Sequence, residues 1–530
     1  MTWLQSATPT HGPAVPYPTE TTSGFTEARF VDVLISHWPV FALLGVILAV
    51  AAVIARWRRG SGRGEPVRIV DVVGWAAVLI LPPLIYVFAL ASGLSTQASI
   101  FAAFLTATVL LWVFGSVAEF VPALVAVVAT LFIGLAPPEV ALGGFASPSL
   151  LLLLGVYALS AVISSSGLSY RLMTRLLLRL PDKPMWHQIT LLGSGYILSP
   201  LMPSAIARMS LLTPVFKDMA SGLKLPNRGP AITGLLAAMF GGALLFSPMM
   251  STSKSSNIAA LGLLPQQVQF EFAGLFWLVA AAVAAIGVTV VHLVALPRLF
   301  PSEGQAPLPR DHMQRKLADM GPLKPGEWIA ASGFVFFLLG SATTSWHHIK
   351  PPYLAGFVLL ALLLSGALLR KEFQRELDWP IIVFLLGIDS MMRIMDHLGL
   401  AQALARVVGQ RFDFVDGRIG LFILITLGVT LAVRLVLPVT AGMLTAVVML
   451  LPVAAAQGIH PWICVFCAAM FSDIAFFRHQ GTNGIIQIRA AGLFEETDER
   501  SFLRYNMVMN AARVAVVFAS IPWWGWLGLL

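Results

Sequence analysis

An apolar run of the chain is interrupted at Leu201-Met202-Pro203-Ser204-Ala205-Ile206-Ala207, and a second run is interrupted in the same way at Val436-Leu437-Pro438-Val439-Thr440-Ala441-Gly442. Each interruption leads on to another apolar segment that polar residues break, at Ser251–Asn257 and at Arg478–Gly484. Non-helical backbone in a bilayer survives only where protein or a water-filled cavity satisfies its peptide groups. Paired interruptions in matching positions of two halves therefore indicate the binding site of a membrane transporter.

The composition places the chain in a membrane. Of its 530 residues, 57% are hydrophobic and 11% are charged, and the mean hydropathy is +0.82. So few polar residues cannot cover a soluble surface, which predicts an all-α polytopic protein in a lipid bilayer. The net charge of +8 fits basic cytoplasmic loops and not a nucleic-acid partner. We expect the bacterial cytoplasmic (inner) membrane as its location.

The chain divides at a long basic loop near its middle. We expect five parts: a flexible N-terminal tail (1–35), an extra span with a basic loop (36–68), a first repeat (69–297), a central cytoplasmic loop (298–326) and a second repeat (327–530).

The basic loops also predict the topology. They can all lie on the cytoplasmic side only if the two proline-tipped segments enter and leave the membrane by the same face. Segment 186–219 is then a re-entrant helical hairpin open to the cytoplasm, and 418–455 is a hairpin open to the other side. A broken transmembrane helix follows each hairpin, at 229–264 and at 460–488. The count gives about twelve spans, and the opposite hairpins make the two repeats inverted.

These residues resemble the divalent anion:sodium symporter family, the dicarboxylate carriers of the wider ion-transporter superfamily. Its members carry hairpin tips of the form Ser-Asn-Thr, which are echoed by Ser204-Ala205-Ile206-Ala207-Arg208 and by Thr440-Ala441. An early Thr-Glu-x-x-Pro element is echoed by Ala118-Glu119-Phe120-Val121-Pro122, and the Gly-Thr-Pro-Pro-Asn type of break by Thr252 to Asn257 and Gly481-Thr482-Asn483. The resemblance covers residues 69–530. It implies an elevator-like motion and a homodimer.

The sequence departs from this family at both tips. The family's tip asparagines, which help to form the sodium and substrate sites, are absent, and Ala205 stands at the first. Lys254 lies in the first helix break, where a fixed ammonium can take the electrostatic place of a sodium ion. We therefore assign no metal ligands and no cofactor. Na⁺ or H⁺ stays open as the coupling ion.

Charged residues inside membrane segments are expensive to bury and indicate function. Here basic residues gather at the tips and breaks, where helix N-termini also offer free N–H groups, so we expect a small anionic substrate. The predicted substrate-binding residues are Ser204, Ala205, Arg208, Thr252, Ser253, Lys254, Ser256, Asn257, Thr440, Ala441, Gly442, Gly481, Thr482 and Asn483. The predicted coupling or ion-pair residues are Arg434, Asp389, Asp473, Arg478 and His479.

Several roles stay open for these charged residues. Arg208 could instead cap or bridge the hairpin, and Arg434 could pair with Asp389 or Asp473. Both aspartates could carry protons or neutralise a neighbouring arginine.

The sequence thus predicts a secondary active transporter, not an enzyme. It would move di- or tricarboxylates or inorganic oxyanions by elevator-like alternating access, coupled to Na⁺, to H⁺ or to anion exchange. No Gly-x-x-x-x-Gly-Lys-Ser/Thr motif for nucleotide hydrolysis occurs. One alternative keeps the fold and makes the protein a cation–proton antiporter or an oxyanion exporter. Another is a membrane-embedded enzyme that uses Ser204 or His479 with an acid.

Overall fold

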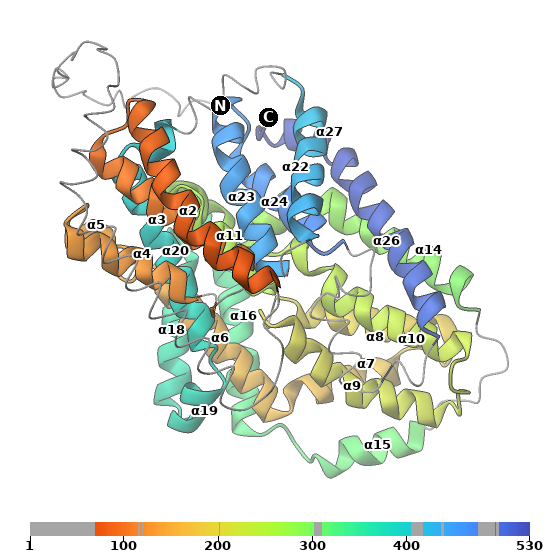
Figure 1. Cartoon of the computed structure of the whole chain (residues 1–530). Helices are drawn as coiled ribbons and strands as arrows, with labels where there is room; N and C mark the ends of the chain where they lie inside the picture. The colour runs from red at the N-terminus through yellow and green to blue at the C-terminus, as the bar shows by residue number, and fades with distance from the viewer. Residues whose placement is uncertain are drawn as a thin grey trace, which may run out of the picture. The chain divides into compact units, whose positions relative to one another are not determined.

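The computed structural model of the chain describes residues 69–114, 117–118, 120–200, 202–301, 310–403, 417–435, 439–474, 493 and 498–530. Every regular element in these ranges is a helix, so the predicted all-α fold is confirmed for this part of the chain (Figure 1). The predicted N-terminal tail and extra span, 1–68, lie outside the described residues.

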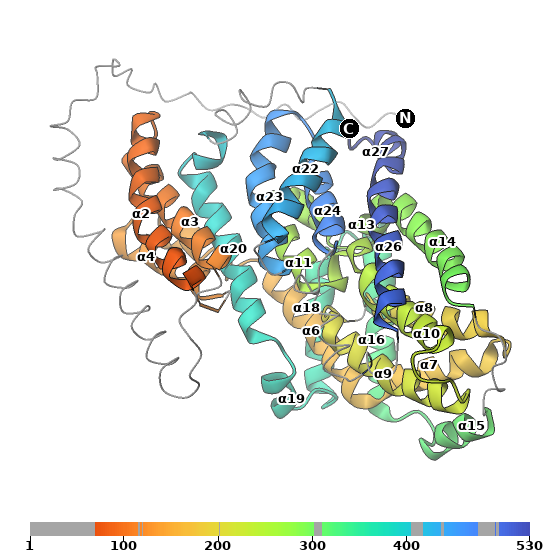
Figure 2. The same ribbon diagram turned by 45° about the vertical axis from the view of Figure 1, so that its right-hand side comes forward.

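The first helices pack on one another in chain order. They are α2 (Ile69–Ala91), α3 (Thr96–Phe114), α4 (Phe120–Ile133) and the short α5 (Pro138–Ala141). Helix α2 lies against α3, α3 against α4, and α4 against α20 (Trp379–His397), as Figures 1 and 2 show. These segments are almost wholly apolar, and a helix satisfies their backbone groups without help from water.

A second group joins the two halves of the sequence. Helix α6 (Ser149–Ser166) packs against α16 (Pro325–Ala342) and α18 (Pro351–Leu364). The central loop between the halves is partly helical, because α15 (Arg310–Asp319) forms in its middle. Helix α15 packs on α7 (Leu168–Arg179), and Lys316 on α15 forms an ion pair of 2.8 Å with Asp218.

The segment with the first proline tip folds as two packed helices. They are α8 (Pro184–Leu198) and α9 (Ala205–Gly222), and Ser204 caps α9 by accepting a hydrogen bond of 3.2 Å from the Ala207 N–H. Helix α8 also packs tightly on the segment that follows α10 (Pro230–Phe240). A Cβ on Gly195 would lie 2.3 Å from the backbone carbon of Gly242, so only a glycine fits there.

The helix that begins with α10 stops and restarts. After Phe240 come a π-helical turn and two 3₁₀ turns, and the chain resumes as an α-helix at Ser255. The pieces are η1 (Gly241–Leu245), η2 (Ser247–Met249), η3 (Ser251–Ser253) and α11 (Ser255–Gly262). Their carbonyl and N–H groups need partners outside a regular helix, and these partners build the candidate site.

The C-terminal helices form a third group. Helices α22 (Ile419–Arg434), α23 (Val439–Ala456) and α24 (Pro461–Ser472) lie side by side around a core with Phe422, Leu450 and Cys464 (Figures 1 and 2). Helix α14 (Ala282–Leu299) runs along α26 (Glu499–Ala519). The remaining elements are short: α12 (Gln266–Phe272), α13 (Leu275–Ala280), α17 (Thr344–His347), α19 (Arg370–Arg375) and α27 (Ile521–Trp526).

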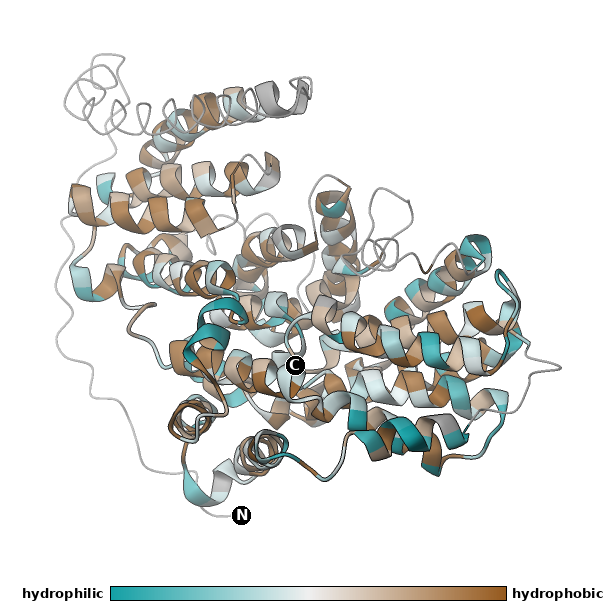
Figure 3. Cartoon of the chain, turned by 90° about the horizontal axis from the view of Figure 1, so that it is seen from below, coloured by the Kyte–Doolittle hydropathy of each residue, from teal (hydrophilic) through white to brown (hydrophobic). Residues whose placement is uncertain are grey.

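Five helical stretches of the described chain are long and apolar enough to cross a membrane, and six shorter apolar helices accompany them. Hydrophobic residues cover most of the length of many helices, while hydrophilic residues gather at several ends and loops (Figure 3). Many large apolar side chains on these helices are exposed, among them Phe88, Phe132, Leu364 and Phe357. Lipid is the medium in which such an exposed surface is stable.

Candidate functional site

The first tip docks against the first helix break. The carbonyl oxygen of Pro203, in the tip, accepts a hydrogen bond of 3.1 Å from the N–H of Ser255, the first residue of α11. The Thr252 hydroxyl donates to the carbonyl of Pro200, 3.3 Å away. Backbone groups that no helix satisfies are thus paired with each other, as burial in an apolar medium requires.

Arg208 holds this junction together. Its guanidinium is fully buried and donates from Nε to the carbonyl of Ala243 at 2.8 Å and from Nη2 to the Ser247 hydroxyl at 2.6 Å. Its Nη1 donates to the carbonyls of Met202 and Ser253. These groups come from the tip, from η1, from the start of η2 and from η3. One cation therefore satisfies orphaned backbone on both sides of the junction, and all its partners are neutral.

Lys254 lies at the end of the break and reaches across to the second half of the chain. Its ammonium forms an ion pair with Oδ1 of Asp473, the residue that ends α24. Oδ2 of the same carboxylate lies 3.6 Å from Nη2 of Arg513, on α26. Three residues from distant parts of the sequence thus form one charged cluster inside the protein.

Arg513 also joins the first broken helix to α24. Its Nη1 donates to the carbonyl of Met470 on α24 at 3.1 Å, and its Nη2 donates to the carbonyl of Leu245 on η1 at 3.2 Å. Arg434, at the end of α22, donates from Nε to the carbonyl of Ser472 at 2.8 Å. The turn that presents Asp473 is therefore fixed by guanidinium groups from two other helices.

Several buried polar atoms beside Lys254 lack a hydrogen-bond partner among the described residues. They are the hydroxyls of Ser253 and Ser256 and the carbonyl oxygen Oδ1 of the Asn257 side chain. The amide nitrogen of Asn257 is used, since it donates to the carbonyls of Ser247 at 2.9 Å and Met250 at 3.0 Å. Buried polar atoms are nearly always paired, so unpaired ones around a charge are typical of a ligand site.

The predicted residues of the second half are only partly placed. Thr440 and Gly442 lie in the first turn of α23, as does Ala441, and α23 packs against α11. Pro438, Arg478, His479, Gly481, Thr482 and Asn483 lie outside the described residues.

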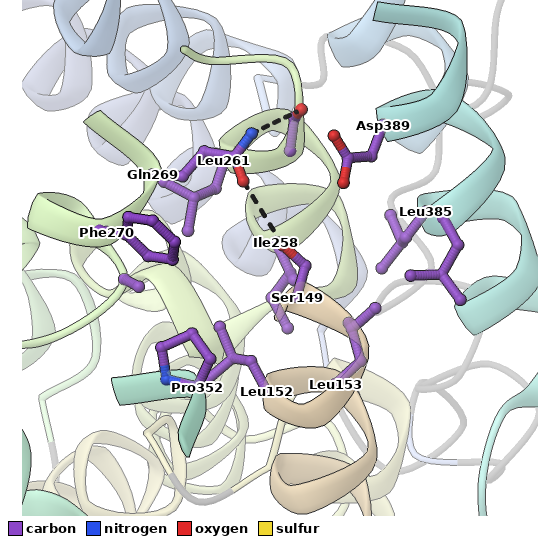
Figure 4. A pocket seen from close by; sticks show the side chains of 13 residues that line it. Ser149, Leu152, Leu153, Ile258, Leu261, Gln269, Phe270, Pro352, Leu385 and Asp389 are labelled. Atoms are coloured by element: carbon purple, nitrogen blue, oxygen red, sulfur yellow. Dashed lines mark hydrogen bonds between the residues drawn. The ribbon is translucent and has the colours of Figure 1, made fainter. Parts of the chain in front are cut away.

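Asp389 lies in a different place from the cluster around Lys254. It forms an ion pair of 3.1 Å with Arg393, one turn away on α20, so the suggested pairing with Arg434 does not describe it. Its carboxylate lines a small cavity of about 30 Å³ together with Ser149 and Gln269 (Figure 4). This volume is enough for one water molecule, not for a substrate. Glu119, in the early motif, lies outside the described residues.

The family model described as the sodium:sulfate symporter transmembrane region matches residues 70–530. The chain belongs to this family. The resemblance to the divalent anion:sodium symporters is thereby confirmed, and this member of the sodium:sulfate symporter family is an integral multi-pass membrane protein, a transporter and not an enzyme.

Three curated relatives are similar to this symporter-family chain, each 24% identical. "Inner membrane protein YbhI" of Escherichia coli matches over 67% of this chain and 77% of its own length. "Putative malate transporter YflS" of Bacillus subtilis matches over 64% and 72%, and "Membrane protein" of Cupriavidus necator over 47% and 50%. The match thus spans only half the length of the Cupriavidus protein. Among solved structures, the Alcanivorax borkumensis YdaH transporter is similar over 76% of this chain and 89% of its own, with 14% identity and a TM-score of 0.47.

The sequence patterns miss three buried residues that lie in or beside the candidate site. Arg513 is one, and the other two are His292 on α14 and Tyr505 on α26, which share a buried hydrogen bond. This pair packs directly against Gly241. A Cβ at that position would lie 2.5 Å from Cε1 of His292 and 2.6 Å from the Tyr505 hydroxyl oxygen, so there is no room for a side chain. A charged or polar residue inside an apolar segment is the signal that could have found all three.

Proposed function

We propose that the protein is a secondary active transporter for small divalent anions, of the dicarboxylate or sulfate kind. The main support for this proposal is a surplus of positive charge where the first proline tip meets the first helix break. Arg208, Lys254 and Arg513 supply three cations, and Asp473 is the one carboxylate within reach of them among the described residues. The difference is two positive charges, and Arg434, whose guanidinium binds the carbonyl next to Asp473, adds its own positive charge.

A surplus of this size needs an anion to balance it. Burying an unpaired charge is strongly unfavourable, so a site that keeps two extra cations is most stable with a divalent anion bound. The segment that continues from the cluster, 474–494, contains no aspartate or glutamate, so it adds no carboxylate. The same charge balance argues against the cation–proton antiporter alternative, because a cationic substrate would be repelled.

The neutral groups beside Lys254 fit the same substrate. The hydroxyls of Ser253 and Ser256 can donate to carboxylate or sulfate oxygens, and the N-terminus of α11 offers its partial positive charge in the same place. The printed names of the relatives agree in kind, since one is a putative malate transporter and the family is described by sodium and sulfate.

The residues at the first tip do not fit a sodium ion. In broken-helix transporters, unwound carbonyl oxygens coordinate Na⁺. Here the carbonyls of Met202, Ala243 and Ser253 already accept hydrogen bonds from Arg208, which supplies a permanent positive charge. We therefore propose a carrier that works without Na⁺ at this position, by anion exchange or with H⁺.

The transport cycle we propose follows from the topology expected from the sequence. The regions 69–297 and 327–530 act as inverted repeats, with the hairpin 186–219 open to the cytoplasm and the hairpin 418–455 open to the other side. Helices α2–α4, α16 and α18 serve as the scaffold, and the hairpins with their broken helices move past it in an elevator-like step. The protein works as a homodimer of about twelve spans per chain.

Uptake by proteoliposomes tests the function. We expect the purified protein to accumulate [¹⁴C]malate or [³⁵S]sulfate, and we expect Lys254→Ala to lower the rate by about tenfold or more, because it leaves Asp473 without its partner and the anion without its cation. Lys217→Ala, an exposed lysine on α9, is the matched control and should keep the wild-type rate. Wild-type vesicles that take up neither anion under any gradient would refute the proposal.

A further inference from the structure

The two oxygens of the Asp473 carboxylate lie in different surroundings. Oδ1 is bound by the Lys254 ammonium, whereas Oδ2 is buried and accepts no hydrogen bond among the described residues. Arg513 is the nearest second cation, with Nη2 at 3.6 Å from Oδ2, which is too far for a hydrogen bond. Nε of Arg513 is also buried without an acceptor. An unused acceptor thus lies 3.6 Å from a guanidinium that still has an unused donor.

A small movement would join these two groups. A guanidinium can bind both oxygens of a carboxylate through two parallel N–H groups, and such a pair is stronger than a single contact. Arg513 is held in place by the carbonyls of Met470 and Leu245, so the carboxylate must move and not the arginine. Turning Asp473 toward Arg513 would release Lys254.

Lys254 is the cation of this cluster that can change partner. Its side chain is 15% exposed, whereas the side chain of Arg513 is fully buried and Arg208 is held on all sides by carbonyls and a hydroxyl. A lysine has a flexible stem and a compact charge, which suits a group that alternates between two anions. The hydroxyls of Ser253, one residue before it, and Ser256, two residues after it, have no hydrogen-bond partner among the described residues.

We propose that Asp473 is an internal counter-anion that holds Lys254 while no substrate is bound and turns onto Arg513 when the transported anion takes Lys254. This inference rests on the proposed function. In the empty carrier the carboxylate neutralises the Lys254 ammonium, and in the loaded carrier the substrate does so. The charge of Asp473 is balanced in both states, by Lys254 in the empty carrier and by Arg513 in the loaded carrier.

This exchange of partners decides which transport modes the protein can carry out. Each unbalanced charge that an empty site carries through an apolar region is costly and slows the return of the empty carrier. With Asp473 present, Lys254 is neutralised and net uptake is allowed. Without that carboxylate, only the loaded carrier crosses easily, so the protein would exchange one anion for another.

The test compares net uptake with exchange in proteoliposomes that contain the full chain. The probe is [¹⁴C]malate or [³⁵S]sulfate, whichever the wild type carries, measured with vesicles that are empty or filled with the unlabelled anion. We expect Asp473→Asn to lower net uptake by about tenfold or more while exchange stays within a few-fold of the wild type. The matched control is Asp218→Asn, another lysine-paired aspartate, whose partner is Lys316. It should leave both modes unchanged.

Each outcome decides the matter. The proposal is overturned if Asp473→Asn keeps net uptake, if it loses exchange while eluting as a monodisperse protein, or if the wild type itself only exchanges. If Asp473→Asn does not fold, Arg513→Lys serves instead. It keeps the charge but removes the fork, so KM should rise several-fold in both modes, and an unchanged KM would overturn the switch. A wild type that moves neither anion refutes the proposed function instead.

Discussion

Arg208 on α9 donates a hydrogen bond of 2.8 Å to the carbonyl oxygen of Ala243, in the π-helical turn where the first broken helix leaves its regular path. The side chain of α9 thereby donates a hydrogen bond to the backbone of a broken helix that lies 35 residues away in the sequence. A π-helical turn leaves carbonyl groups out of register, and such turns are frequent at functional sites. The tip and the break therefore depend on each other and form one structural unit.

Removing the guanidinium should loosen this unit. Arg208→Gln removes the hydrogen bonds that the guanidinium donates to the carbonyls of Met202 and Ser253 and to the Ser247 hydroxyl, and each buried group left unsatisfied costs about 1–3 kcal/mol. We expect a marked fall in the melting temperature in detergent. Lys217→Gln, an exposed position on the same helix, should leave the melting temperature unchanged. Equal melting temperatures for Arg208→Gln and the wild type would contradict the assigned role.

The same guanidinium predicts how transport responds to ions. Replacing Na⁺ by choline on both sides of the vesicle should leave the initial rate of malate or sulfate uptake unchanged, because Arg208 already binds the carbonyls that a sodium ion would need. The measurement is initial uptake at equal ionic strength and membrane potential. Strong stimulation by Na⁺, saturable in the millimolar range, would mean that a sodium site exists elsewhere in the chain.

Part of this site is readable in the sequence because its signals are local. Lys254 stands out as a charge among Ser253, Ser255 and Ser256 inside an apolar segment, and Arg208 follows a proline tip. Both patterns predict broken backbone with a charged group close by. The anionic substrate that we propose is predicted by the same features, since basic residues at helix ends favour an anion.

The rest depends on contacts between distant segments. Lys254 and Asp473 are 219 positions apart, so no local pattern could show that they form an ion pair. Arg513 lies in an apolar stretch without a proline break, and that stretch therefore predicts an ordinary final span. The sequence suggests Asp389 as a site residue because it is a carboxylate in an apolar segment. In the structure it forms an ion pair with Arg393, one turn away on the same helix. The sequence therefore shows that a charge is buried, but the tertiary packing determines which residue pairs with it.

The unpartnered hydroxyls give a prediction that separates binding from stability. Ser253→Ala and Ser256→Ala should each raise the KM for the anion by a few-fold, equal to about 1 kcal/mol for a lost hydrogen bond, without lowering the melting temperature. Ser251→Ala is the matched control in the same break, because its hydroxyl donates to the carbonyl of Ala273 at 3.1 Å. That variant should lower the melting temperature and leave KM unchanged. The opposite assignment of effects would show that the serine hydroxyls serve the fold.

The close fit between Gly241 and the His292–Tyr505 pair gives the last prediction. In Gly241→Ala the new methyl group would lie 2.5 Å from Cε1 of His292 and 2.6 Å from the hydroxyl oxygen of Tyr505, so side chains or backbone must shift. Overpacking of this kind costs about 1–3 kcal/mol, and the shift would displace the π-helical turn whose Ala243 and Leu245 carbonyls bind Arg208 and Arg513.

We therefore expect Gly241→Ala to lower both the melting temperature and the uptake rate. Gly193→Ala on α8 has no atom within 4 Å of its new methyl group and should hold or raise the melting temperature, since alanine favours a helix over glycine by about 1 kcal/mol. The contrast between two glycines of neighbouring helices separates a steric effect from a general loss of flexibility. If both variants behave alike, the His292–Tyr505 pair does not position the break.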